Sequence, residues 1–344
     1  MPKILVILTG GTIGSGIQSG IIDTNLSHSL QLIELYRQKY NDKKLDFEVI
    51  QPINILSENL YLDHWNKLCY ALSEINFSRY NGIIITHGTD TLPYTSSVVG
   101  LLFGKSPIPI VITASNYPLE DPRSNGLQNF KSAIDFILSS ELKGVYTIFQ
   151  NAQNESIVYL STRITEADSY LDQFSSFGGQ ALGRILNGKY IHNFSYINPT
   201  IKELSDNSKN DKLTCWFEND ILLIRPYPGL NYNQYDLGFA PKAVLHCLYH
   251  SSTACTDSEN YSLISFISRC KERNIPIYVS SFKRQENYYI SSKLFLEMDV
   301  IPLFNTSVES AYAKLLIAYN QKVVKPQELI KQNLFFESLP NMRD

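Results

Sequence analysis

The sequence predicts an α/β protein with a larger N-terminal domain on a doubly wound, mainly parallel sheet and a smaller C-terminal α/β domain. Three observations support this fold class. Short β-branched runs alternate with segments of helical period from Lys3 onward, a polar segment then interrupts the pattern, and a second such cycle follows. With 344 residues, of which 44% are hydrophobic and 18% charged, the chain can bury two cores, and wholesale disorder is excluded.

We expect the N-terminal domain to span residues 1–197. Its predicted strands are Lys3–Leu8, Phe47–Pro52, Gly82–Thr86, Ile108–Thr113 and Gly144–Gln150. The helices predicted between them are Leu26–Lys39, His64–Glu74, Thr95–Phe103 and Gln128–Ser139. Residues 198–212, rich in Pro, Ser, Asn and Lys, predict a linker. In the C-terminal domain, residues 213–344, we expect strands Ile221–Pro226, Ala243–Tyr249, Ile277–Ser281 and Val300–Pro302, with helices Ser258–Glu272 and Ser307–Tyr319.

Charge and cysteine usage limit the classes of function. The net charge of -3, with no basic stripe, argues against a nucleic-acid partner. The apolar run Ile4–Leu8 is too short to span a bilayer and lacks the pattern of a signal peptide. Five cysteines without a CxxC pair indicate neither a disulfide framework nor a zinc site. We therefore expect a cytoplasmic protein without membrane contact.

A glycine-rich turn, residues 9–16, directly follows the first predicted strand. Glycines let the backbone approach a ligand and leave amide groups free to bind an anion or oxyanion. The spacing is not GxGxxG, and Gln51-Pro52 ends the second strand where an acidic ribose ligand is expected, which argues against a dinucleotide site. Thr12 on this turn is instead a candidate nucleophile.

The segment Thr86–Thr91 follows the third predicted strand and places Thr89 beside Asp90. A hydroxyl next to a carboxylate can hold an amino group or orient a water, although both residue types are also common helix N-caps. His87 is expected to be a hydrogen-bonded structural residue, because no Asp–His–Ser order elsewhere supports a hydrolase triad.

Taken together, the Thr9–Ile13 turn and the His87–Thr91 segment resemble the asparaginase/glutaminase family, the L-asparaginases of types I and II. The resemblance extends over about residues 3–195, where further segments match the family in order. These are Ser57–Leu60 ahead of Trp65, Thr113–Asn116 with Ser124–Gly126 and Asn129, and Gln173–Gly183.

This resemblance implies hydrolysis of the side-chain amide of asparagine through an acyl-enzyme, without a metal or organic cofactor. Thr12 would be the nucleophile. Thr89 and Asp90 would act with it, and Ser57 and Asp90 would hold the carboxylate and amino groups of the substrate, a small amino-acid amide. The resemblance also implies a homodimer or homotetramer. The catalytic set is then Thr12, Thr89, Asp90 and Arg163, and the substrate-binding set is Gly11, Ser57, Glu58, Gly88, Thr89, Asp90 and Ala114.

Three residues depart from the family pattern. The family lysine matches best to Arg163, which stays charged and cannot relay a proton. The mobile-loop tyrosine is missing, with Ile21 or Ile22 near its position, and the Asp after the fourth strand is Asn125. A misaligned loop is the alternative explanation, with another side chain taking over; the candidates are Tyr36, Lys131 and Lys283.

The departures leave two other functions open. One is an amidohydrolase for glutamine, a D-amino-acid amide or a peptide-linked amide. The other is a catalytically weak amino-acid sensor that keeps the binding residues. In the C-terminal half, residues 250–253 and 285–286 follow predicted strands and are candidate site residues, although turn and capping roles are equally common there.

Overall fold

The computed structural model describes residues 1–18, 21–24, 26–40, 44–206 and 213–341. Its contacts divide the chain into two compact units. The large unit comprises Met1–Phe217 with Leu334–Phe336, and the small unit comprises Glu218–Asn333 with Glu337–Asp344. Each unit is described by itself.

The large unit is built on a mixed sheet with the order β12-β11-β8-β7-β6-β5-β1-β4. The strands from β4 to β7 in this order pair in parallel, and β8, β11 and β12 continue the sheet in antiparallel fashion. Their bounds are β1 Lys3–Leu8, β4 Asp46–Ile50, β5 Gly82–Thr86, β6 Pro109–Thr113, β7 Gly144–Gln150, β8 Ser156–Leu160, β11 Gly183–Leu186 and β12 Lys189–His192. Two separate antiparallel ladders are β2 Ser15–Gln18 with β3 Ile21–Thr24, and β9 Ile164–Asp168 with β10 Gln173–Ser176.

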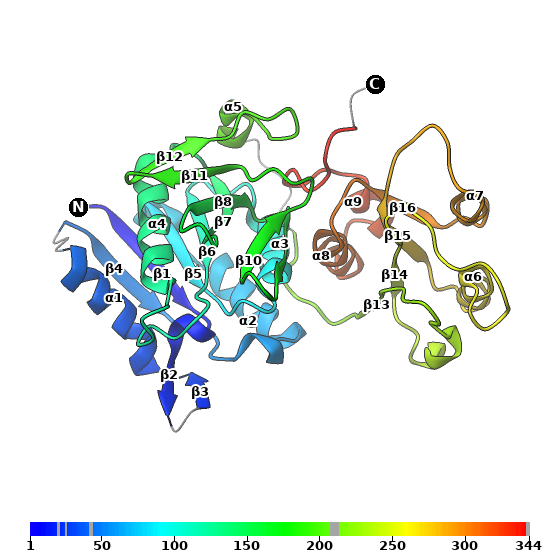
Figure 1. Cartoon of the computed structure of the whole chain (residues 1–344), viewed down its shortest axis with the longest axis horizontal. Coiled ribbons are helices and arrows are strands. Elements are labelled where there is room, and N and C mark those ends of the chain that lie inside the picture. Colours follow the sequence, from blue (N-terminus) through cyan, green and yellow to red (C-terminus); the bar gives the residue numbers. More distant parts are fainter. Residues whose placement is uncertain (19–20, 25, 41–43, 207–212, 342–344) are drawn as a thin grey trace. The chain divides into compact units, whose positions relative to one another are not determined.

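Helices cover both faces of this sheet, as Figure 1 shows. The helices α1 Leu26–Tyr40 and α4 Gly126–Ser139 pack together on one face. The helices α2 Leu62–Ser73 and α3 Leu92–Phe103 lie on the other face, with the short α5 Ile201–Ser205 beyond the antiparallel end. Strands covered on both sides need apolar side chains in both directions, and every residue of β5 and β6 is buried.

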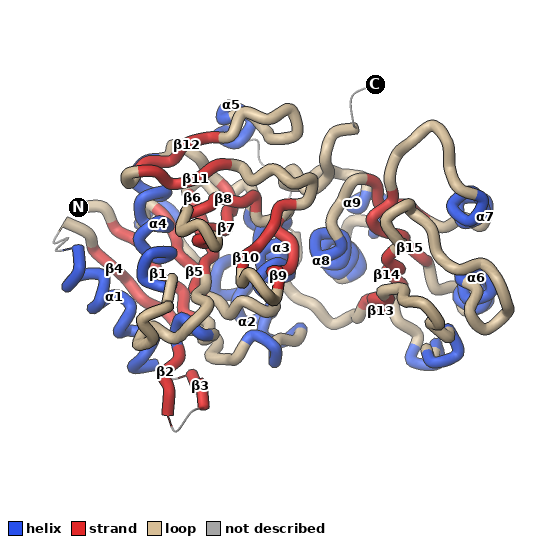
Figure 2. The backbone as a smooth tube through the Cα atoms, in the orientation of Figure 1, coloured by secondary structure: helices blue, strands red, loops and turns tan. Residues whose placement is uncertain are grey.

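The small unit contains a four-stranded parallel sheet in the order β13-β14-β15-β16. Figure 2 shows these strands between two pairs of helices, α6 with α7 and α8 with α9. The strands are β13 Ile221–Ile224, β14 Ala243–Cys247, β15 Ile277–Phe282 and β16 Ile301–Phe304, and the helices are α6 Leu263–Glu272, α7 Ile290–Glu297, α8 Val308–Tyr319 and α9 Pro326–Ile330. The amphipathic α6 buries Leu263, Phe266, Ile267 and Cys270 in the core of this unit.

The predicted fold class is confirmed, and the differences are local. The helix predicted to begin at Thr95 begins at Leu92, because Pro93 fits the first turn of a helix. The helix predicted from Ser258 begins only at Leu263, since Ser258 has a left-handed backbone conformation, with φ of 62°. The strands β8 to β12 were not predicted. In the segment predicted as a linker, α5 occupies 201–205, and 207–212 lie outside the described residues.

Two further observations bear on the class of protein. All five cysteines are free thiols. Among the described helices, none combines the length and the apolar character needed to cross a membrane.

Candidate active site

The sheet of the large unit has its switch point at β1, which has β4 on one side and β5 on the other. Ligands of open α/β sheets bind at such a point, outside the carboxyl ends of the strands. The segments that follow β1, β4, β5 and β6 therefore meet at one edge. They contain the Thr9–Thr12 turn, Ser57, the His87–Asp90 segment and Ala114.

The glycine turn after β1 is held against the segment that follows β4. Gly11 N donates to Ile55 O at 2.8 Å, and Ile55 N donates to Thr9 O at 3.0 Å. Gly10 and Gly11 have φ of 94° and 71°, which side chains with a Cβ rarely adopt. The turn places half-buried Thr12 at the start of a short 3-10 helix, Thr12–Gly14.

The expectation that this turn leaves its amide groups free is wrong for two of them. Gly11 N donates to Ile55 O, and Gly14 N donates to Gly11 O at 3.0 Å. These bonds fix the position of Thr12 relative to the neighbouring segment. An oxyanion formed at Thr12 would therefore need donors other than these two amides.

Two glycines bring the three segments into direct contact. A Cβ on Gly11 would lie 2.4 Å from the backbone nitrogen of Gly88, and a Cβ on Gly88 would lie 2.4 Å from Ser57 Oγ. Only residues without side chains allow this approach. Buried Ser57 is also bound to the next residues of the β5 segment, since its Oγ donates to Asp90 Oδ2 at 3.4 Å and its carbonyl accepts from Thr91 Oγ1 at 2.9 Å.

His87 is a buried structural residue, as the sequence predicts. Its Nδ1 lies 2.8 Å from Gly88 O, and its Nε2 lies 2.9 Å from Thr95 Oγ1, which accepts from Trp65 Nε1 at 3.0 Å. A carbonyl can only accept, so Nδ1 carries the proton and Nε2 accepts from the threonine. Burial lowers the pKa of His87 to about 4, so the ring is neutral at pH 7.

The remaining substrate-binding candidates differ in exposure. Thr89 is half-buried and Asp90 is exposed, so both stay accessible beside Ser57. Ala114 is fully buried at the end of β6, and its carbonyl accepts from Asn129 Nδ2 at 2.9 Å. The side chain of Glu58 is exposed, in contrast to buried Ser57 next to it.

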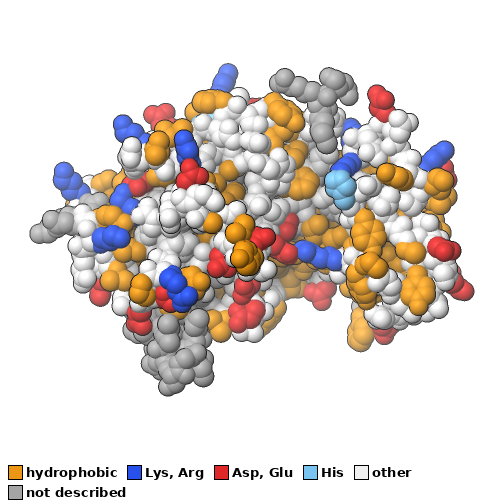
Figure 3. Space-filling model, viewed as in Figure 1, with side chains coloured by type: hydrophobic (Ala, Val, Ile, Leu, Met, Phe, Trp, Pro, Cys, Tyr) orange, Lys and Arg blue, Asp and Glu red, His pale blue; other side chains and the backbone are white. Residues whose placement is uncertain are grey.

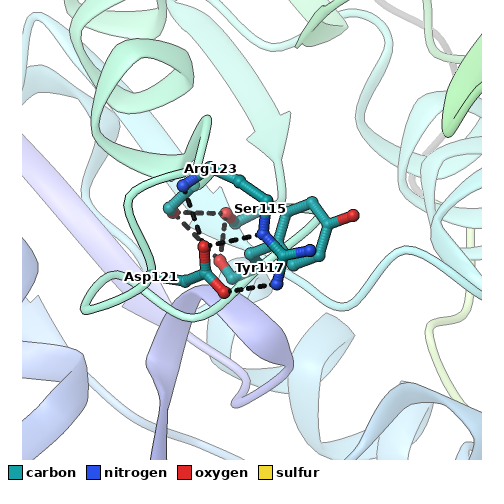
Figure 4. Close-up of polar contacts among 5 residues, drawn as sticks. Ser115, Tyr117, Asp121 and Arg123 are labelled. Atoms are coloured by element: carbon teal, nitrogen blue, oxygen red, sulfur yellow. Dashed lines mark hydrogen bonds and ion pairs between the residues drawn. The ribbon is translucent and has the colours of Figure 1, made fainter.

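The loop after β6 is stiffened by its own polar contacts, drawn in Figure 4. Arg123 donates from Nε and Nη2 to the carboxylate of Asp121 at 3.0 and 2.7 Å, and its guanidinium lies 4.1 Å from the ring centroid of Tyr117. These hydrogen bonds lower the pKa of Asp121 to about 2. Asn125 holds the two ends of the loop together, because its Oδ1 accepts from Asn116 N at 2.9 Å.

The described contacts of Arg163 are with backbone carbonyls of two distant segments. Its Nε donates to Phe336 O at 2.5 Å and its Nη1 to Ile197 O at 2.6 Å. The neighbouring Thr162 lies against Gly100 of α3. Eight residues separate Gly100 from the start of α3 at Leu92, or about 12 Å along the helix, and Thr89 precedes that start. Arg163 therefore anchors the C-terminal segment.

The residues considered as replacements for missing groups have other contacts in the structure. Tyr36 is 1% exposed and packs edge-on against Phe47 and Phe130 in the core. Lys131 pairs with Asp135 on the same helix. Lys283 belongs to the small unit, where its Nζ lies 3.4 Å from His250 Nε2.

Sequence reasoning missed the buried polar residues that contact His87 and its helix. Trp65 and Thr95 hold the ring of His87, and their spacing in the sequence gives no signal of this contact. Ser96, Thr147 and Ser161 form a buried hydroxyl chain between α3, β7 and the end of β8, with oxygens 2.9 and 3.0 Å apart. No group of three His, Cys, Asp or Glu side chains placed to hold a metal ion occurs in the described ranges.

Fold and site together define an α/β protein with a threonine-bearing glycine turn at the switch point of a parallel sheet, packed against the segment that carries a Thr-Asp pair. The family model described as "Asparaginase, N-terminal" matches residues 3–196. The chain belongs to the asparaginase family, as its sequence motifs indicate.

The individual relatives are L-asparaginases and subunits of a glutamyl-tRNA(Gln) amidotransferase. The L-asparaginase of Thermococcus kodakarensis is 34% identical over 177 residues, which cover 51% of each protein. The solved structure of the L-asparaginase from this organism matches with a TM-score of 0.78 at 25% identity, covering 98% of this chain and 99% of that one. A glutamyl-tRNA(Gln) amidotransferase subunit of Methanosphaera stadtmanae is 28% identical over 343 residues, covering 96% of this chain and 75% of that protein. The L-asparaginase I of Vibrio cholerae shares the fold, with a TM-score of 0.76 at 20% identity, 98% coverage of this chain and 99% of that one.

Proposed function

We propose that this protein hydrolyses the side-chain amide of L-asparagine to give L-aspartate and ammonia, with Thr12 as the nucleophile. The observation that carries the proposal is the convergence of Gly11, Gly88 and Ser57 at the switch point. This convergence brings the turn that bears Thr12 next to the segment that bears Thr89 and Asp90.

The reaction follows from this arrangement in two steps. The Thr12 hydroxyl loses its proton and attacks the amide carbon, the C–N bond breaks, and ammonia leaves with a proton. Water then attacks the resulting ester, which releases aspartate and restores the hydroxyl. Thr89 and Asp90 supply the hydroxyl and carboxylate beside the reacting group, and Arg163 has no part in the proposed site.

Recognition of the amino acid is assigned to Ser57 and Asp90. The Asp90 carboxylate would pair with the α-ammonium group, and Ser57 Oγ would donate to the α-carboxylate in place of its present bond to Asp90. Gly11, Gly88 and Ala114 would line the site with backbone atoms, and Glu58 would face it from the solvent side. We retain a homodimer or homotetramer as the proposed assembly, supported by the family resemblance alone.

A second candidate function is release of ammonia from another amide donor, glutamine in particular. It is supported by the likeness to the glutamyl-tRNA(Gln) amidotransferase subunit of Methanosphaera stadtmanae, which extends over 96% of this chain. The two candidates share Thr12 and the acyl-enzyme, so they differ only in which amide is turned over.

The test is ammonia release from L-asparagine, L-glutamine and D-asparagine by the wild type and by Thr12→Ala, Thr12→Ser and Thr165→Ala. Thr165 is a half-buried threonine on β9, whose Oγ1 donates to Ser175 O, and it serves as the matched control. Fastest release from L-asparagine that is lost in Thr12→Ala and kept in Thr165→Ala supports the proposal. Preference for glutamine selects the second candidate, and release that persists in Thr12→Ala refutes the nucleophile.

A further inference from the structure

The small unit contains a cavity of about 390 Å³ at the carboxyl ends of β13 and β14. Its walls come from the loop after β13, with Tyr227 and Leu230, and from the loops after β14, with Tyr249, Asp257 and Tyr261. This volume is within the range of small-molecule sites, and the edge is the one where parallel sheets bind ligands. The proposed amidohydrolase reaction assigns no role to this cavity.

The cavity is preformed by backbone hydrogen bonds on both sides. Tyr232 N donates to Asn260 O at 2.8 Å, which joins the two loops, and Leu230 N donates to Tyr227 O at 3.1 Å. Tyr249 is held by its own turn, since Tyr249 N donates to Thr253 O at 2.8 Å. A ligand would therefore meet positioned side chains and would not need to order these loops.

The base and the rim of the cavity differ in character. Leu230 and Tyr232 form the base and are 5% and 2% exposed, and the hydroxyl of Tyr232 is occupied by His246 Nε2 at 2.8 Å. The rim consists of Tyr227, Tyr249 and Tyr261, which keep 48%, 38% and 42% of their surfaces exposed. Three partly exposed tyrosines thus line the cavity together with two buried residues.

Charge decides which ligand fits. Asp257 is the one charged residue among the described residues that line the cavity, and none of them is Lys or Arg. Aromatic faces attract cations through their quadrupole, and this attraction grows when the cation is partly desolvated. A bound anion would find no positively charged partner among the lining residues. A neutral apolar ligand would offer no positive charge to Asp257.

We propose that this cavity binds a small organic cation, an ammonium or guanidinium compound, between the three tyrosine rings and the carboxylate of Asp257. All its lining residues belong to the small unit, and none of them is assigned to amide hydrolysis. Binding can therefore be tested whether or not the protein hydrolyses asparagine.

The probe is choline, and its control is 3,3-dimethylbutan-1-ol, which has the same shape without the charge. Binding of both to the full chain is measured by isothermal titration calorimetry and by saturation-transfer NMR. We expect choline to bind at least about tenfold more tightly than the alcohol, which corresponds to about 1.4 kcal/mol. Equal binding of the two probes, or no binding of choline, would overturn the proposal.

Variants locate the binding site. Tyr227→Leu and Asp257→Asn are each expected to weaken choline binding about tenfold, in line with a desolvated cation–aromatic contact. Tyr289→Leu removes another exposed tyrosine of the small unit, 61% exposed and not part of the cavity lining, and should bind choline as the wild type does. Choline binding that is unchanged in both cavity variants would place the cation elsewhere and refute the assignment.

Discussion

Replacing Arg163 by lysine separates a structural from a catalytic role for this position. The guanidinium is 3% exposed and donates to two carbonyls, Phe336 O at 2.5 Å and Ile197 O at 2.6 Å. Lysine keeps the charge, but its single ammonium group lacks the planar fork that serves two acceptors in different directions. We therefore expect Arg163→Lys to lower stability and to leave turnover close to that of the wild type.

The size of the effect follows from the lost hydrogen bond. A bond from a charged donor contributes about 1.5–3 kcal/mol, and the abandoned carbonyl stays buried. For a unit of this size, each kcal/mol lowers the melting temperature by about 2–4 °C, so a decrease of roughly 3–12 °C is expected. Thr162→Val should act in the same direction, because Thr162 Oγ1 donates to Phe335 O at 2.7 Å in the same C-terminal segment.

Differential scanning calorimetry and ammonia release measure the two quantities on the same preparations. Arg184→Lys is the matched control, since Arg184 pairs with Glu155 at 3.2 Å with half of each side chain exposed. Such exposed pairs contribute at most about 1 kcal/mol. A rise in turnover of Arg163→Lys without a loss of melting temperature would show that the arginine stands in for the family lysine, and would refute the structural role.

Three further perturbations address the site and the cores. Gly88→Ala should abolish turnover, because its Cβ would lie 2.4 Å from Ser57 Oγ, and assays of ammonia release measure the loss. His87 has a folded-state pKa of about 4, below its unfolded value near 6.5. Its contribution to stability is therefore complete above pH 6.5, and the free energy of unfolding falls by about 3 kcal/mol as the pH drops to 4. Urea titrations across this pH range measure the decrease. Lys314→Met should destabilise the small unit by about 3–5 kcal/mol, because it leaves Glu337 buried without the ammonium at 2.6 Å, as thermal unfolding would show.

Each of these perturbations has its own control. Gly179→Ala adds a Cβ with nothing within 4 Å, so activity should persist in this control even though Gly179, unlike Gly88, has a positive φ of 74°. The pH slope should be shallower in His87→Gln, and an unchanged slope would assign the effect to other groups. The double variant Lys314→Met, Glu337→Leu should regain most of the lost stability, and failure to do so would mean that packing around Lys314 dominates.

The parallel part of the sheet was predictable because its strands are short apolar runs bounded by turn residues. The predicted bounds of Lys3–Leu8, Gly82–Thr86 and Gly144–Gln150 agree with β1, β5 and β7. The antiparallel end was not predictable in this way. Strands such as β9 and β11 alternate buried and exposed residues over four or five positions, too short a stretch for a period to stand out from a loop.

The site was predictable where a motif fixes the backbone, and not where a side chain crosses between elements. The turn with Gly11 and the segment with Gly88 were correctly placed at strand ends, because their glycines are typical of turns. The direction of Arg163 depends on Phe336, which lies far along the chain, and no local pattern contains that contact. Motif spacing alone therefore could not predict this contact.

Positive and negative side chains are mixed on the surface, as they are along the sequence. Figure 3 shows Lys and Arg interspersed with Asp and Glu on the face in view, with no continuous field of one sign. A small zwitterionic substrate would thus be recognised by single groups at short range and not by a surface potential. In the proposed function these groups are Ser57 and Asp90.

The proposed function makes substrate binding and amide chemistry separable. In it, binding depends on Ser57 and Asp90, whose side chains are in contact, and a Cβ on Gly88 would clash with Ser57 Oγ. The proposed chemistry depends in addition on Thr12, whose turn is held by the backbone bond from Gly11 N to Ile55 O. Asp90→Asn should therefore weaken binding of aspartate, and Thr12→Ala should leave it intact while abolishing turnover. Calorimetry with aspartate measures binding in both variants, and ammonia release then distinguishes an enzyme from a sensor: both would bind aspartate in Thr12→Ala, but only the enzyme has wild-type turnover to lose.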